Sequence, residues 1–140
     1  MTKKRRLGLM PPWQRHLTWF GLALCALSGS AYLIGHEFNV LVQQLGNHSI
    51  LVVHGVSAAL VIFILGAVAT VHIKAGLVAR KSLISGFTQL VALVLLVATG
   101  LLLYYGSEEI RELTILSHWI LGLFFMPFFI FHATRKIRIE

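Results

Sequence analysis

Residues 115–134 read ILSHWILGLFFMPFFIFHAT, and none of these side chains carries a fixed charge. A helix needs about 20 mainly apolar residues to cross the hydrocarbon core of a bilayer, which is about 30 Å thick. Backbone polar groups find no water in lipid, so a run of this kind must satisfy its own hydrogen bonds by forming a helix. The stretch therefore predicts a transmembrane helix with one histidine near each end.

Three more apolar runs precede it, near residues 17–36, 50–72 and 83–105. The whole chain is 57% hydrophobic and only 12% charged, whereas soluble domains are about 45–50% apolar and about 25% charged. Short connections between successive spans favour an antiparallel up-down-up-down arrangement. We expect an all-α, integral membrane four-helix bundle that forms a single domain over residues 1–140 and has the lipid bilayer as its surroundings.

The formal net charge of +7 does not indicate a nucleic-acid partner, because the basic residues form no stripe alternating with stacking aromatic residues. They flank the apolar runs instead, and basic residues gather on the cytoplasmic side of a membrane. The predicted topology leaves Arg111 alone on one side, which makes both termini cytoplasmic. The basic residues on the opposite side are Lys3, Lys4, Arg5, Arg6, Arg15, Lys74, Arg80, Lys81, Arg135, Lys136 and Arg138.

Histidines in membrane spans are candidates for function by default, and four of them are regularly spaced. His54 and His72 are 18 residues apart, which in an α-helix is five whole turns and about 27 Å of rise. His118 and His132 are 14 residues apart, about 40° short of four turns and about 21 Å of rise. Each of these helices therefore presents one histidine near each membrane face.

The second and fourth spans run parallel in the predicted topology, which places His54 level with His118 and His72 level with His132. Two facing imidazoles can take both axial positions of a haem iron, and iron with two such ligands transfers electrons. The sequence thus predicts two b-type haems, one at the outer level and one at the inner level. His16 is the alternative inner ligand in place of His72.

Other polar residues are candidates for secondary roles. His36 is placed to hydrogen-bond a haem propionate or to line a quinone site, and Arg135 and Lys136 are placed to neutralise propionates at the inner level. We expect His48 to be a solvated loop residue.

Several short segments resemble the small bacterial di-haem cytochromes b that serve as membrane subunits of Ni-hydrogenases and formate dehydrogenases, together with their stand-alone relatives. The similarity covers nearly the whole chain, and the 14-residue histidine spacing is its most specific feature. The matching pieces are Ala26-Leu27-Ser28-Gly29, His54-Gly55, Thr99-Gly100 with Leu103-Tyr104-Tyr105, and Ser117-His118-Trp119 followed by His132.

The resemblance implies that His54, His118 and His132 are haem ligands. In many relatives the fourth ligand lies in the first helix and is followed at once by Trp, whereas Leu17 follows His16 here. The stand-alone relatives have a histidine near the end of the second helix, which favours His72 and gives His36 a secondary role.

The resemblance further implies a respiratory protein of the bacterial inner membrane that exchanges electrons between quinone or quinol and a periplasmic redox enzyme or cytochrome. Two alternatives stay open: a haem-free membrane anchor subunit of a periplasmic enzyme, and a small histidine-bearing transporter.

Overall fold

The computed structural model describes residues 10–38, 47–80 and 82–134, which contain helices and turns and no strand. The chain divides into two compact units, Met1–Gly86 and Phe87–Glu140. The helices in chain order are α1 (Pro12–Phe38), α3 (Asn47–Val68), the π-helix η1 (Ala69–Ile73), α4 (Lys74–Ala79), α5 (Leu83–Tyr105) and α6 (Glu108–Thr134).

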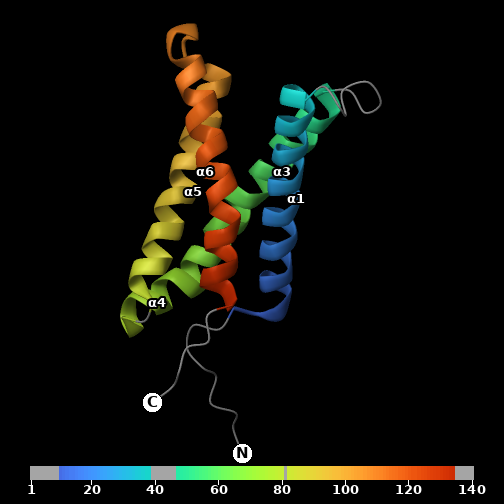
Figure 1. Ribbon diagram of the computed structural model, residues 1–140. Coiled ribbons are helices and arrows are strands. Elements are labelled where there is room, and N and C mark those ends of the chain that lie inside the picture. The colour runs from blue at the N-terminus through green and yellow to red at the C-terminus, as the bar shows by residue number, and fades with distance from the viewer. Residues whose placement is uncertain (1–9, 39–46, 81, 135–140) are drawn as a thin grey trace, which may run out of the picture. The chain divides into compact units, whose positions relative to one another are not determined.

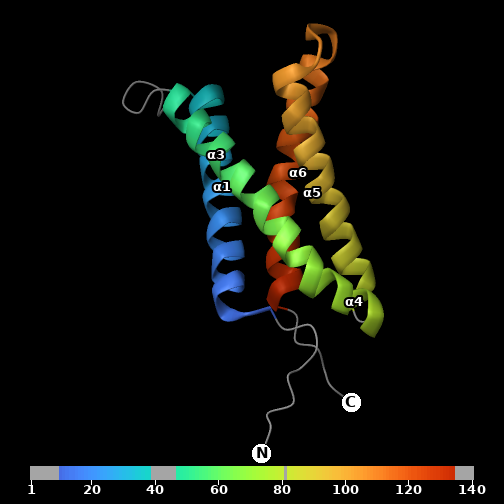
Figure 2. The same ribbon diagram turned by 180° about the vertical axis from the view of Figure 1, so that it is seen from behind.

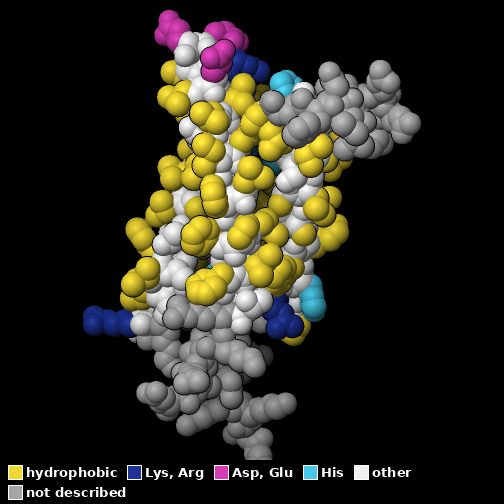
Figure 3. Space-filling view, viewed as in Figure 1, with side chains coloured by type: hydrophobic (Ala, Val, Ile, Leu, Met, Phe, Trp, Pro, Cys, Tyr) yellow, Lys and Arg dark blue, Asp and Glu magenta, His cyan; other side chains and the backbone are white. Residues whose placement is uncertain are grey.

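Four helical stretches are long and apolar enough to cross a membrane: Pro12–His36, His48–Val78, Leu83–Tyr105 and Glu108–Thr134. This confirms the prediction of an all-α protein with four spans, and it identifies the bilayer as the environment of a multi-pass membrane protein. Apolar side chains cover the sides of the helices (Figure 3), as lipid contact requires.

Two spans begin earlier than their apolar runs suggest. The first helix starts at Pro12 instead of residue 17, because the fixed backbone angle of proline suits the first position of a helix. The last helix starts at Glu108 instead of residue 115, because Glu108 and Glu109 in its first turn interact favourably with the helix dipole. Hydropathy alone assigns these polar first turns to the connections.

In the first unit, α1 and α3 lie side by side in both views (Figures 1 and 2). A Cβ atom built on Gly21 would lie 2.9 Å from Cδ1 of Ile64, and one built on Gly29 would lie 2.9 Å from Cε1 of His54. The earlier glycine thus faces the later residue of α3, which shows that the two helices are antiparallel. Glycine lets membrane helices approach closely, and Ser57, the most deeply buried side chain in α3, continues this contact face.

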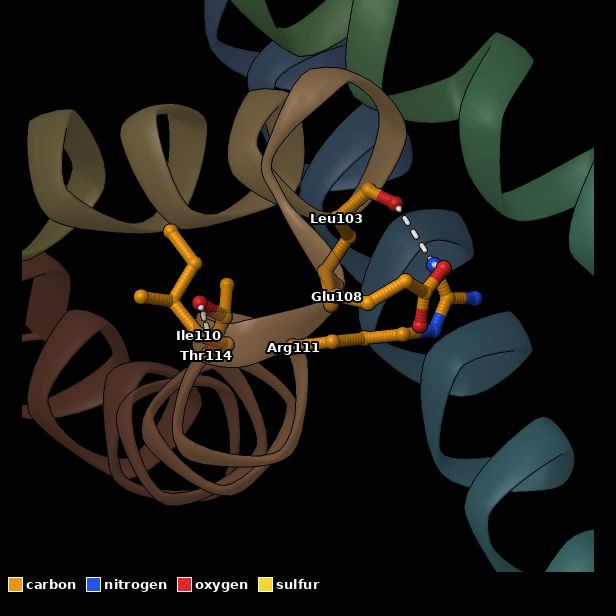
Figure 4. Close-up of polar contacts among 5 residues, drawn as sticks. All are labelled: Leu103, Glu108, Ile110, Arg111 and Thr114. Atoms are coloured by element: carbon orange, nitrogen blue, oxygen red, sulfur yellow. Dashed lines mark hydrogen bonds and ion pairs between the residues drawn. The ribbon is translucent and has the colours of Figure 1, made fainter.

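The second unit holds most of α5 and all of α6, joined by a turn of two residues, Gly106 and Ser107. A Cβ atom on Gly106 would lie 2.5 Å from the Leu102 carbonyl oxygen, so the turn needs glycine. The Arg111 guanidinium donates to the Leu103 carbonyl at 3.5 Å and lies 3.9 Å from a Glu108 carboxylate oxygen (Figure 4). Arg111 thereby satisfies one of the carbonyls that the end of α5 leaves without a helical partner.

Candidate functional site

His54 packs against α1, and its ring nitrogen Nδ1 is surrounded by acceptors from that helix. Nδ1 lies 2.9 Å from the carbonyl oxygen of Cys25, 3.4 Å from the hydroxyl oxygen of Ser28 and 3.8 Å from the Cys25 sulfur. The Ser28 hydroxyl donates its own hydrogen to the Leu24 carbonyl at 2.7 Å. The shortest contact therefore joins the His54 ring to a backbone carbonyl.

This contact fixes the tautomer of His54. A carbonyl oxygen can only accept a hydrogen bond, so Nδ1 must carry the hydrogen. In the neutral ring the lone pair then resides on Nε2. A metal-bound histidine typically donates its other ring N–H to a backbone carbonyl or a carboxylate in this way.

The His54 ring lies directly over Gly29. A Cβ atom at position 29 would come within 2.9 Å of Cε1 and 3.1 Å of Nδ1 of that ring. Any side chain at this position would therefore displace the imidazole, and glycine is what lets the ring pack against α1.

His118 in α6 has the same construction with a different acceptor. Its Nδ1 lies 2.8 Å from the hydroxyl oxygen of Thr99 in α5. That hydroxyl donates to the carbonyls of its own helix, at 2.8 Å to Leu95 and 3.1 Å to Leu96. A hydroxyl has one hydrogen, so the Thr99 oxygen must accept from His118, which places the hydrogen on Nδ1 and the lone pair on Nε2.

Gly100 follows Thr99 as Gly29 follows Ser28, and it too lies beside the imidazole. A Cβ atom at position 100 would lie 3.6 Å from Cε1 of His118, an ordinary van der Waals distance. The second unit therefore leaves room for a methyl group where the first leaves none.

His72 lies in η1, where the helix departs from the regular spacing that the sequence suggests. The Lys74 N–H bonds to the Ala69 carbonyl, five residues back, as in a π-helix. The extra residue in this turn rotates the residues beyond it by up to about 100° relative to a continuous α-helix. The assumption of five whole α-helical turns between His54 and His72 is therefore wrong, although both residues do lie on the second membrane span.

The remaining histidines lie near helix ends. His132 is in the last turn of α6 and is half-buried, five residues after Pro127. His16 is exposed in the second turn of α1. His36 is exposed at the other end of α1, where its ring stacks on Tyr32 at a centroid distance of 6.0 Å.

His48 lies in the first turn of α3, so the prediction that it is a loop residue is wrong, while its side chain is exposed as expected. The reason is that α3 begins at Asn47, before the apolar run that starts near residue 50. Arg135 and Lys136 lie outside the described residues.

Each predicted histidine pair takes one ring from each unit. His54, His72, His16 and His36 belong to the first unit, and His118 and His132 belong to the second. The pairings His54 with His118 and His72 with His132 therefore stay predictions. Within the described residues, no three His, Cys, Asp or Glu side chains group together as a multi-ligand metal site would require.

The acceptors of the histidine N–H groups are the part of the site that sequence reasoning missed. In the sequence, Ser28-Gly29 and Thr99-Gly100 stand out only as pieces of the family resemblance. For His118 the signal is a hydroxyl residue followed by glycine, Thr99-Gly100, on the antiparallel helix at the level of the ring. For His54 the corresponding pair, Ser28-Gly29, marks the level of the ring, but the main acceptor is the Cys25 carbonyl.

One buried polar group in the second unit has no partner. Gln89 in α5 has its side-chain Nε2 buried, and no residue in the described part of the chain accepts its hydrogens. Buried N–H groups are nearly always hydrogen-bonded, so this amide is suited to an oxygen acceptor of a bound group.

Comparison with known proteins gives no further guide to the family. No protein-family profile matches the chain, and neither a curated protein nor a solved structure matches it.

Proposed function

We propose that this protein is a transmembrane di-haem cytochrome b that exchanges electrons between membrane quinone and a periplasmic redox enzyme or cytochrome. The observation that carries the proposal is the shared state of His54 and His118. Both rings donate Nδ1–H to a neighbouring helix, one to the Cys25 carbonyl and the other to the Thr99 hydroxyl. Both therefore have the Nε2 lone pair with which a neutral imidazole binds iron.

The residues around these rings suit a large flat cofactor. Gly29 and Gly100 leave the imidazoles against bare backbone, and small residues let a helix come close to a neighbouring group. Elsewhere on α5, Gln89 offers a buried N–H donor to a carboxylate or carbonyl oxygen of a bound group. When bound, a haem with two imidazole ligands supplies one-electron transfer at its iron.

We assign His54 and His118 to the outer haem, and His72 and His132 to the inner haem, with His16 as the alternative to His72. The position of His72 in a π turn supports a functional role, because such turns are frequent at functional sites. His36, Arg135 and Lys136 are proposed to contact propionates or quinone.

The chain itself would hold the rings in one tautomer, keep water away with apolar side chains and fix the depth of each pair. Apolar residues such as Leu22, Val61 and Ile64 are buried at the α1–α3 contact, and Phe125 and Phe129 are buried on α6 with their rings stacked at 6.4 Å. An environment of this kind strengthens the hydrogen bonds that orient the imidazoles.

The proposed location is the bacterial inner membrane with both termini in the cytoplasm. In the first unit, Arg15 lies near the start of α1, and Lys74 and Arg80 lie near the end of the second span. Because the two spans are antiparallel, these three basic residues lie at the same end of the unit. In the second unit, acidic side chains gather over the α5–α6 turn (Figure 3), and Arg111 there is engaged with the Leu103 carbonyl. This distribution follows the positive-inside rule.

A reduced-minus-oxidised visible spectrum of the purified full chain, with the haem-to-protein ratio, tests the proposal. We expect b-type bands and about two haems per chain, as two bis-histidine sites require. A ratio of one would show that one inferred pair is wrong. Absence of haem bands after expression with adequate haem supply would refute the proposal and leave the haem-free anchor or the histidine-bearing transporter.

Separate substitution of His72 and His16 identifies the inner ligand. Only the loss of the true ligand should abolish the inner haem, while the other variant should keep both. His48→Ala is the matched control, because His48 is an exposed histidine that has no place in the proposed pairs.

A further inference from the structure

We propose that Thr99 is a positioning residue for His118, which holds the ring in its iron-binding tautomer and lowers the midpoint potential of the iron that the ring would ligate. The second part of this inference rests on the proposed function. The first part, the control of the tautomer, concerns only residues of this chain.

Towards His118, the Thr99 hydroxyl can only accept a hydrogen bond, because its single hydrogen is donated elsewhere. Its hydroxyl hydrogen is shared between the carbonyls of Leu95 and Leu96, at 2.8 and 3.1 Å. Threonine in a helix commonly makes this back-bond to the preceding turn, which fixes its rotamer. Towards His118 the hydroxyl oxygen can then only accept, through a lone pair, at the 2.8 Å contact with Nδ1.

Removing the Thr99 oxygen would leave the half-buried Nδ1–H of His118 without this acceptor. The ring could regain a hydrogen bond by moving its hydrogen to Nε2 or by rotating, and either change reduces the ability of Nε2 to bind a metal. Loss of such an outer partner typically lowers metal affinity by about 10- to 100-fold.

The same bond affects the electronics of the ligand. An acceptor on Nδ1–H withdraws that hydrogen slightly, which raises the basicity of the imidazole. A more basic ligand stabilises ferric iron relative to ferrous iron, and second-shell hydrogen bonds are one of the means by which proteins set haem potentials. With Thr99 in place, the midpoint potential should therefore be lower than without it.

Thr99→Val tests the inference, because valine keeps the shape of threonine and removes the oxygen. Thr99→Ser keeps the oxygen. Thr114→Val is the matched control, since the Thr114 hydroxyl also back-bonds to its own helix, at 2.8 Å to the Ile110 carbonyl. Each variant is made in the full chain and measured in two ways.

The first measurement is a potentiometric titration of the haem-loaded protein. We expect Thr99→Val to raise one of the two midpoint potentials, and Thr99→Ser and Thr114→Val to match the wild type. The second is ¹⁵N NMR of histidine in the haem-free chain. We expect the His118 shifts to change from the Nδ1–H pattern towards the Nε2–H pattern in Thr99→Val alone.

Unchanged potentials and unchanged His118 shifts in Thr99→Val would overturn the inference. Should that variant not assemble, Thr99→Ala is compared with Thr99→Ser under the same criteria, because alanine also lacks the oxygen and introduces no branched side chain. If the wild type holds no haem, the proposed function fails, and the NMR result alone still decides whether Thr99 controls the His118 tautomer.

Discussion

His54 in the first unit and His118 in the second reach the same chemical state by different means. His54 donates to a backbone carbonyl at 2.9 Å and lies over a glycine with no room for a methyl group. His118 donates to a side-chain hydroxyl at 2.8 Å and lies beside a glycine where a methyl group would make ordinary contact. The first ring is thus held by the main chain and by shape, and the second by one replaceable oxygen, so the two should fail under different substitutions.

The largest expected effect is one in which the two units do not differ. His54→Ala and His118→Ala would each remove one proposed ligand of the proposed outer haem, and each should lower the haem content from about two per chain to about one. The pyridine haemochrome assay of purified protein measures this ratio, with His48→Ala as the control. Retention of both haems in either variant would show that the residue is not a ligand and would end the comparison between the two rings.

The next effect separates the units by shape. Gly29→Ala places a methyl group 2.9 Å from the His54 ring and should displace it, whereas the methyl group of Gly100→Ala reaches normal contact distance from His118. Overpacking of this kind costs about 1–3 kcal/mol. We expect Gly29→Ala to lose haem at a lower temperature in a thermal ramp, with Gly100→Ala close to the wild type. If the temperature of haem loss fell equally in the two variants, the difference in the space beside Gly29 and Gly100 would not matter, and this prediction would be wrong.

A smaller effect separates the units by hydrogen bonding. Ser28→Ala removes an oxygen 3.4 Å from His54 Nδ1 but leaves the Cys25 carbonyl at 2.9 Å. The midpoint potential should therefore shift less in Ser28→Ala than in Thr99→Val, which removes the 2.8 Å acceptor itself. The two potentiometric titrations are compared directly, and a larger shift in Ser28→Ala would mean that the serine, and not the carbonyl, is the main acceptor for His54.

These differences mark the boundary of what the sequence could predict. Four spans follow from four long apolar runs, because lipid imposes helical structure on any such segment. The starts of α1 and α6 could not be predicted from hydropathy, since they depend on Pro12 and on two glutamates in a polar first turn. The π turn around His72 could not be predicted either, because residues 69–73 contain no proline or glycine that would indicate an irregular helix.

The candidate site, too, could be predicted from the sequence only in part. Histidine spacing along one helix can be counted, and it indicates which rings are candidates for a site. The partner of each ring comes from a different helix, at a position set by the register between antiparallel helices, which spacing along one helix does not fix. The contact of Thr99 with His118 depends on the alignment of α5 with α6. The Cys25 carbonyl is a main-chain group that every residue has, so the sequence does not distinguish it.

The smallest expected effect extends the comparison to a third hydroxyl–glycine pair. Ser85-Gly86 precedes Thr99-Gly100 by fourteen residues on α5, and His118 and His132 are separated by the same fourteen residues on α6. The Ser85 hydroxyl donates to the Ser82 carbonyl at 3.2 Å, which leaves its oxygen, like that of Thr99, able to accept a hydrogen bond. Ser85 belongs to the first unit and His132 to the second, so the expectation rests only on the matched spacing and on the proposed haems. On that basis Ser85→Ala should raise the midpoint potential of the proposed inner haem by less than Thr99→Val raises that of the proposed outer haem, because alanine leaves space in which water can replace the lost acceptor. Titration of Ser85→Ala in the His118→Ala background isolates the inner haem. An unchanged potential there would restrict the hydroxyl–glycine arrangement to the two histidines at which the structure shows it.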